Sequence, residues 1–249
     1  MTANCAEPGS DANHPSEWLG STRLLDLEDS RLRLHAMRIT QLATSDLQKA
    51  TLVHDYIKLL PFGCVAGFDA VPAADVLKRG RGDCHTKGTL FVALLRCAGV
   101  PARLRFVSLN GAFLHGIIDI GQSTIIHALG EVYLNERWVQ TDTYVTDSLL
   151  EVQASHLLQH ERRSAGYGIH VSGQRFWDGL QHAHAQYAAS DAASLPTHDW
   201  GVAHDPEGFY SNQANPHLRL GWLARAKWIV AAQVVNRRTQ TLRDRAASA

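Results

Sequence analysis

Three residue types that together can form a nucleophilic triad occur along the chain: a cysteine, a histidine and an aspartate. Cys84 follows Gly82 and Asp83 at the predicted start of a helix. Free N–H groups and the positive end of a helix dipole favour the thiolate there, which is the nucleophilic form. His127 could accept the thiol proton, and Asp142 could orient the imidazole. These residues indicate attack on a carbonyl group, provided that the three side chains converge.

The segment after Cys84 predicts an amphipathic helix with defined ends. Asp83 is a suitable N-cap, and Gly99 followed by Pro101 stops the helix. Apolar residues recur at helical spacing and should bury one face, namely Leu90, Phe91, Leu94, Leu95 and Ala98. The alternative is that Cys84 is an ordinary buried thiol, since free cysteines are often buried.

The segment from 123 to 142 predicts a β-hairpin that brings the other two residues together. A β-rich run over 123–134 is followed by a turn at 135–137 and a second strand from Trp138. His127 and Asp142 lie far from the tip and should approach each other across the strands if the register has no bulge. Other carboxylates that could replace Asp142 are Asp147, Asp119 and Glu131.

These segments resemble the core of the transglutaminase-like superfamily, in the bacterial type. The resemblance covers about Leu42 to Asp147: Gly-Asp-Cys opens a helix that ends in Ala-Gly-Val-Pro-Ala-Arg, followed in order by His-Ala, Glu-Val-Tyr-Leu, Trp-Val and Thr-Asp. It implies an α+β fold with a papain-like core, in which the nucleophile helix packs on an antiparallel sheet. It also implies that Cys84 is the nucleophile, His127 the general base and Asp142 its orienting partner.

One position departs from that family pattern. Many members have tryptophan two residues after the histidine, whereas this chain has Leu129. Leu129 is therefore a candidate cleft residue, and the shape of the cleft should differ here.

Further residues are candidates for the oxyanion hole and the cleft. The Cys84 backbone N–H is the natural first oxyanion donor, and a second would come from Tyr56 or Lys58 upstream. His85 could line the cleft or be exposed, and Lys87 could add to thiolate stabilisation. Arg81 closes a cationic segment over 78–81 that is either a solvated loop or a rim that stabilises the thiolate and attracts an acidic substrate.

Composition limits the class of partner. The 249 residues are 45% hydrophobic and 19% charged with formal net charge 0, so no global field would attract nucleic acid or an anionic membrane. No apolar run is long enough to cross a bilayer, and the first residues lack the pattern of a signal peptide. We expect a cytoplasmic protein.

The cysteines and histidines do not predict a metal or any other cofactor. Cys5, Cys64, Cys84 and Cys97 lack CxxC spacing, and no HExxH is present. The alternative, a tetrahedral zinc set, would use Cys84, His85, His115 and His127.

The chain should divide into a loose arm over 1–15, a catalytic core over 16–149 and a helical extension over 150–249 that packs on the core. Within the core we expect helices at 30–42, from 44 or 45 to about 60, and at 72–78. Strands at 103–109 and 114–120 should be joined by Asn110-Gly111, a hairpin-turn dipeptide. The extension should hold helices at about 148–163 and 218–245.

The residues and the resemblance together predict cysteine-dependent acyl transfer on an amide, ester or thioester. With water as acceptor the enzyme would be a hydrolase or protease, and with an amine a transamidase or N-acyltransferase. The substrate could be a peptide, a protein or a small acyl compound. The alternative is a non-catalytic binding or scaffold domain that keeps the fold.

Overall fold

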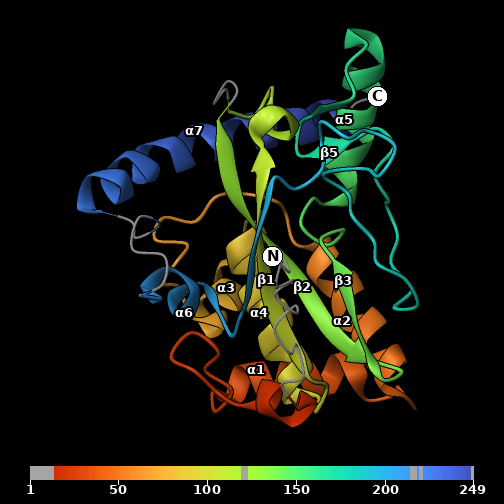
Figure 1. Ribbon diagram of the computed structural model, residues 1–249, viewed down its shortest axis with the longest axis vertical. Helices are drawn as coiled ribbons and strands as arrows, with labels where there is room; N and C mark the ends of the chain where they lie inside the picture. The colour runs from red at the N-terminus through yellow and green to blue at the C-terminus, as the bar shows by residue number, and fades with distance from the viewer. Residues whose placement is uncertain (1–13, 119–122, 214–217, 219–220, 248–249) are drawn as a thin grey trace, which may run out of the picture.

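The centre of the molecule is a four-stranded antiparallel sheet with the strand order β3-β2-β1-β6 (Figure 1). This computed structural model describes residues 14–118, 123–213, 218 and 221–247. The sheet consists of β1 (Ala102–Asn110), β2 (Thr124–Leu134), β3 (Arg137–Thr141) and β6 (His198–Ala203). The prediction of mixed helices and antiparallel strands is confirmed.

The predicted hairpin is formed by β2 and β3. Asn135 and Glu136 connect the strands with φ values of 49° and 63°. A type I′ turn needs positive φ at both central residues. On its other side β2 pairs with β1, where Val107 faces His127. The histidine therefore lies on a strand that is held on both sides.

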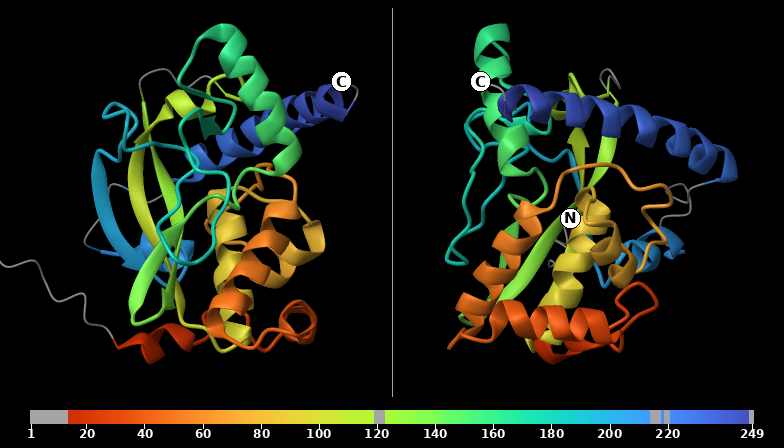
Figure 2. Two further views of the ribbon diagram at one scale, coloured as in Figure 1. Left: turned by 90° about the vertical axis from the view of Figure 1, so that its right-hand side faces the viewer. Right: turned by 180° about the vertical axis from the view of Figure 1, so that it is seen from behind.

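Helices pack on one face of this sheet (Figure 2). They are α1 (Ser30–Thr40), α2 (Asp46–Leu59), α3 (Ala73–Arg79) and α4 (Cys84–Cys97), as predicted to within a few residues, and a short 3-10 helix η1 (Pro15–Leu19) precedes them. The predicted arm over 1–15 falls almost entirely outside the described residues.

Helix α4 is buried on nearly all sides, so the expectation of a single buried face is wrong. Every residue from His85 to Arg96 is buried. The helix contacts β1 and β2, and α1, α2 and α3 pack around its other sides. A helix in the centre of a fold has no solvent face for polar residues. Its polar side chains must instead find partners inside the protein.

The predicted strand at 114–120 is not formed in its described part, and Asn110-Gly111 is not a hairpin turn. Asn110 has φ −62°, and its side chain accepts a hydrogen bond from the Ala112 N–H at 2.9 Å. This Asx-type cap starts the 3-10 helix η2 (Gly111–Leu114) instead of a type I′ turn. Residues 119–122 lie outside the described part.

The region after 150 completes the sheet rather than forming only helices. It contains α5 (Ser148–Glu161), α6 (Pro206–Ser211), α7 (Trp222–Ala247), the short pair β4 (Ala165–Gly166) and β5 (Ile169–His170), and the edge strand β6. Strand β6 is partly or fully exposed throughout, and Gly201 within it has φ 84°. Edge strands of this kind carry no regular apolar alternation, which explains why the sequence did not indicate it.

Helix α7 is fastened to the rest of the fold by a buried ion pair. It crosses one end of the molecule beside α5 (Figure 1). Arg243 Nη2 donates to Asp147 Oδ2 at 2.7 Å, and Nε donates to both carboxylate oxygens at 3.1 Å. Asp147 also accepts from the Phe62 N–H at 2.8 Å, and both charged side chains are buried. The pair joins α7, the start of α5 and the loop before α4.

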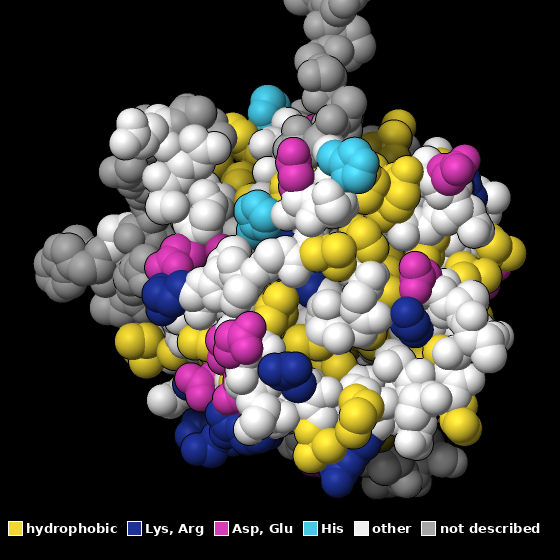
Figure 3. Space-filling view, turned by 90° about the horizontal axis from the view of Figure 1, so that it is seen from below, with side chains coloured by type: hydrophobic (Ala, Val, Ile, Leu, Met, Phe, Trp, Pro, Cys, Tyr) yellow, Lys and Arg dark blue, Asp and Glu magenta, His cyan; other side chains and the backbone are white. Residues whose placement is uncertain are grey.

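The described surface mixes the two signs of charge. In Figure 3, Lys and Arg side chains are interspersed with Asp and Glu on the face seen from below, in keeping with a formal net charge of 0. No described helix has the length and apolar character needed to span a membrane.

Replacing Arg243 with methionine should lower the free energy of unfolding by about 3–5 kcal/mol, because the buried Asp147 carboxylate would lose its cation. Urea unfolding measures this change. The matched control is Arg237→Met, an exposed arginine on the same helix, which should change stability by no more than about 0.5 kcal/mol. A loss below about 1 kcal/mol, the value of a surface pair, would contradict the role given to Arg243.

Candidate active site

The start of α4 is fixed by a capping box. Asp83 Oδ1 accepts from the N–H groups of His85 and Thr86 at 3.1 and 3.0 Å, and the Asp83 N–H donates to Thr86 Oγ1 at 2.9 Å. Gly82 is required before it, because a Cβ there would lie 2.5 Å from Thr86 Oγ1 and 3.1 Å from the Lys87 nitrogen. This geometry holds Cys84, which is half-buried, in the first helical turn.

His127 and Asp142 meet as the hairpin predicts. His127 Nε2 lies 3.1 Å from Asp142 Oδ2, and both side chains are fully buried. Asp142 Oδ1 accepts from the Ala185 N–H at 2.6 Å. The strand register pairs Gly130 with Thr141, so Asp142 follows β3 and is a diagonal neighbour of His127, not its direct partner. Diagonal neighbours are still within reach of long side chains.

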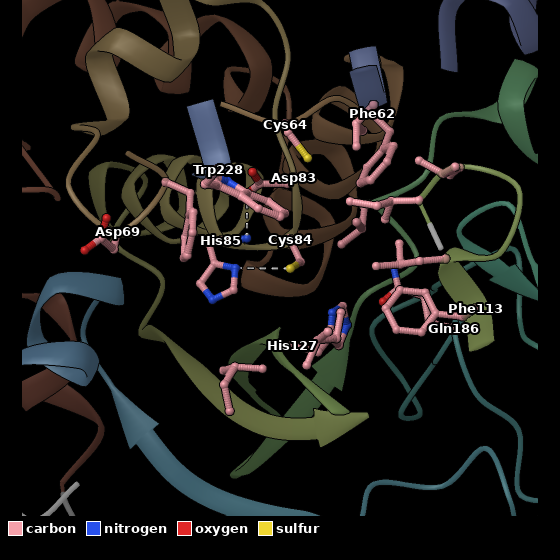
Figure 4. A pocket seen from close by; sticks show the side chains of 18 of the residues that line it. Phe62, Cys64, Asp69, Asp83, Cys84, His85, Phe113, His127, Gln186 and Trp228 are labelled. Atoms are coloured by element: carbon pink, nitrogen blue, oxygen red, sulfur yellow. Dashed lines mark hydrogen bonds between the residues drawn. The ribbon is translucent and has the colours of Figure 1, made fainter. Parts of the chain in front are cut away.

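Asp142 binds Nε2 of His127, so the second ring nitrogen, Nδ1, remains available to the thiol of Cys84. His127 Nδ1 is buried and has no hydrogen-bond partner among the described residues. It lines the same cavity as Cys84 (Figure 4). His127 therefore influences the sulfur by its charge in this structure, and its Nδ1 is available to exchange a proton there.

A second histidine lies directly against the sulfur. His85 Nδ1 is 3.2 Å from Cys84 Sγ, and its Nε2 is 2.9 Å from the hydroxyl of Tyr210 on α6. The His85 ring also packs on Phe68, with ring centroids 4.7 Å apart. Of the two positions open for His85, exposed or in the cleft, the structure places it in the cleft.

The charges in this site oppose the effect of burial. Burial alone would raise the pKa of the Cys84 thiol, but the positive charges of His85 and His127 lower it to about 6. Burial would lower the pKa of His127, yet the Cys84 thiolate and the hydrogen bond to Asp142 raise it to about 9. The pKa of His85 is also raised, since the Cys84 charge outweighs burial. Between about pH 6 and 9 the stable state is thus thiolate beside imidazolium.

The two upstream candidates for the oxyanion hole are not at this site. Tyr56 is half-buried and packs on the His35 ring, with centroids 4.6 Å apart. Lys58 Nζ donates to the Thr143 carbonyl at 2.8 Å and to Glu151 Oε1 at 2.7 Å. The Cys84 N–H makes no hydrogen bond with any described residue, so it stays the candidate donor.

Three cleft candidates also lie elsewhere. Lys87 is fully buried and donates to the carbonyls of Leu60 and Val145 at 2.8 and 2.9 Å; burial lowers its pKa to about 7. Arg81 is exposed and lines a separate cavity. Leu129 is buried in a small apolar cluster. Lys87 and Leu129 do not line the cavity beside the sulfur, because the packing around α4 and behind β2 was not visible in the local sequence. The exposed Arg81 fits the solvated-loop alternative.

The other carboxylates considered for the orienting role have different partners. Asp147 binds Arg243 on α7, and Glu131 binds Arg103 and Arg105 at 2.7 and 2.5 Å. Asp119 lies outside the described residues. The alternative zinc set is not assembled either: His115 lies 3.9 Å from Glu161, and the described residues contain no group of three or more His, Cys, Asp or Glu side chains placed to hold a metal ion.

The cavity beside the sulfur has a volume of about 560 Å³. Cys84, His85 and His127 line it together with Gln186 and Trp228, two residues that the sequence did not single out (Figure 4). Tyr210, which the sequence also did not single out, lines it as well. These three come from beyond residue 150 and carry no motif, so only the tertiary structure could reveal them.

Comparison with known proteins agrees with the resemblance. Residues 35–143 match the transglutaminase-like superfamily. Similar solved structures include "Putative Cysteine Protease from Cytophaga hutchinsonii", 19% identical with a TM-score of 0.43 over 51% of this chain and 41% of that one. Another is "Putative Protease from Parabacteroides distasonis", 16% identical with a TM-score of 0.36 over 47% of this chain and 24% of that one. This chain therefore spans less than half of either protein. No curated protein matches it.

The alkylation of Cys84 by iodoacetamide should follow the thiolate and rise with pH around a midpoint of about 6. In His127→Ala the midpoint of the alkylation curve should rise by about 1–3 pH units, because a positive charge near the sulfur is lost. Mass spectrometry of labelled peptides measures both curves, with Cys97 as the internal control. A midpoint near 8.5, that of a free cysteine, would contradict the thiolate.

His85→Gln should also raise the midpoint of the Cys84 alkylation curve by about 1–3 pH units, since an imidazolium next to the sulfur is replaced by a neutral amide. Tyr210→Phe is the matched control, because it removes the hydroxyl on His85 Nε2 but keeps the ring charge, and its shift should be smaller. An unchanged midpoint in His85→Gln would show that His85 does not stabilise the thiolate.

Proposed function

The chain belongs to the transglutaminase-like superfamily through residues 35–143, and from this premise we propose that it is a cysteine-dependent acyl-transfer enzyme. In this proposal Cys84 is the nucleophile, His127 is the general acid and base, and Asp142 orients His127. The observation that carries the proposal is the thiol of Cys84, which lines a cavity together with two imidazole rings that lower its pKa.

The first half of the reaction forms an acyl-enzyme. The Cys84 thiolate attacks the carbonyl carbon of an amide, ester or thioester, and a C–S bond forms while the carbonyl oxygen becomes an oxyanion. The Cys84 backbone N–H donates to that oxyanion. The imidazolium of His127 gives its proton to the leaving nitrogen, oxygen or sulfur. The bond to the leaving group breaks and leaves a thioester on Cys84.

The second half resolves the thioester. Neutral His127 takes a proton from water or an amine, whose oxygen or nitrogen attacks the thioester carbonyl. The thiolate of Cys84 leaves, and the imidazolium is restored. Asp142 keeps the proton on Nε2 throughout, because its carboxylate accepts from that nitrogen. With water the product is a carboxylic acid, and with an amine it is a new amide.

An acyl donor such as 4-nitrophenyl butyrate should leave one butyryl group on Cys84, seen as an added mass on its peptide. Asp142→Asn should slow this acylation by at least about 100-fold, because the imidazole loses its orienting partner. Added glycine ethyl ester should be acylated if the enzyme accepts amines, whereas only butyrate forms if water is the acceptor.

Cys84→Ser separates chemistry from packing. It should abolish acylation and change the free energy of unfolding by no more than about 1 kcal/mol, since the volume change is small. The corresponding change at the far end of the same helix, Cys97→Ser, should leave acylation intact. Acylation no faster than that of an ordinary exposed thiol would instead favour a non-catalytic binding domain.

A further inference from the structure

The walls of the cavity beside Cys84 are mainly apolar. Aromatic and aliphatic side chains from the loop before α4, from η2 and the segment after it, from β2 and from α7 all contribute (Figure 4). They are Phe62, Phe68, Phe113, Leu114, Ile117 and Trp228, with further aliphatic residues between them. The volume of about 560 Å³ lies within the range of small-molecule sites, about 300–1,000 Å³. A chain placed here would be removed from water on several sides.

The charges around the cavity disfavour an anion. Among the described residues that line it there are two carboxylates, Asp69 and Asp83, and no lysine or arginine. Asp83 holds the helix N-terminus, and Asp69 is 4% exposed. Moving a carboxylate into these surroundings would lose hydration without gaining a lysine or arginine from the described lining residues. The histidine charges are already balanced by the Cys84 thiolate and Asp142.

One polar side chain in the lining lacks a partner. Gln186 is 3% exposed, and its buried Oε1 receives no hydrogen bond from a described residue. Its position is fixed by the preceding residue, Ala185, whose N–H binds Asp142. A buried carboxamide oxygen without a donor is unfavourable. A ligand N–H that reached it would remove this penalty.

We infer that the acyl donor is an uncharged amide with an apolar aliphatic or aromatic acyl group, which occupies this cavity while an amide N–H binds Gln186 Oε1. The inference rests on the proposed function, because it places the scissile carbonyl at Cys84. It adds the class of substrate: neutral and apolar, and not the acidic substrate that a cationic rim would attract.

Protection of Cys84 from iodoacetamide tests this inference without any need for turnover. Hexanamide should slow alkylation. The concentration needed for half-maximal protection should be at least about tenfold lower for hexanamide than for adipic acid monoamide, which has the same chain length but ends in a carboxylate. Shortening the chain to butanamide should weaken protection by up to about fourfold per methylene, from ~0.8 kcal/mol for each buried CH₂. Equal protection by the neutral and the anionic amide, or none by hexanamide, would overturn the inference.

Two variants locate the effect in the cavity. Leu114→Lys places a cation in the lining of the cavity and should narrow or reverse the preference for hexanamide over adipic acid monoamide. The control is Leu149→Lys on the exposed side of α5, which should leave this preference unchanged. Gln186→Leu should weaken protection by hexanamide by about tenfold and leave protection by methyl hexanoate, which has no N–H, unchanged. An equal loss for both compounds would remove Gln186 from the inference.

The outcome can be separated from that of the proposed function. Protection with the predicted preference but no butyryl transfer to Cys84 would support the apolar site and reject acyl transfer. Acylation of Cys84 without any preference between the neutral and anionic amides would keep the enzyme and reject this substrate class.

Discussion

A thiolate at the end of a buried helix has to be balanced by positive charge close to it, and the rest of the site follows from this requirement. The N-terminus of α4 supplies only a partial charge. His85 supplies one imidazole at 3.2 Å from the sulfur, and His127 supplies another from the facing strand. Asp142 then balances His127 from behind. Each group is tolerated in the interior because its neighbour carries the opposite charge or a matching hydrogen bond.

Two buried basic side chains outside the active site, Lys87 and Arg103, also have partners inside the protein. Lys87 follows Cys84 by three residues, yet its Nζ donates to two backbone carbonyls, those of Leu60 and Val145. Arg103 is buried against Glu131 and lies over the Trp138 ring, 3.9 Å from its centroid. These contacts hold α4 to the preceding loop and β1 to β2. They fix the two elements that present the cysteine and the histidine.

The sequence was most informative where function depends on local structure. The N-cap at Asp83, the helix end at Gly99 and the hairpin around Asn135 are short-range signals, and they sufficed to place Cys84, His127 and Asp142 on the correct elements. It was least informative about packing. Whether Lys58 and Lys87 face a cleft or the interior depends on helices distant in sequence. Strand β6 has too few apolar residues to be recognised without its partner β1. Gln186, Tyr210 and Trp228 reach the cavity only through the path of the chain after residue 150.

Helix α7 joins a rigid attachment to a wall of the cavity. Arg243 fixes its C-terminal part, and Arg238 Nη1 also donates to the Ile117 carbonyl at 3.1 Å. Trp228 lies fifteen residues before Arg243, which is about 22 Å along a helix. Between these two residues, Asn236 Nδ2 donates to the Cys64 carbonyl at 3.0 Å. The side chains that stabilise the C-terminal part of α7 therefore also hold in place the helix that contributes Trp228 to the wall of the cavity.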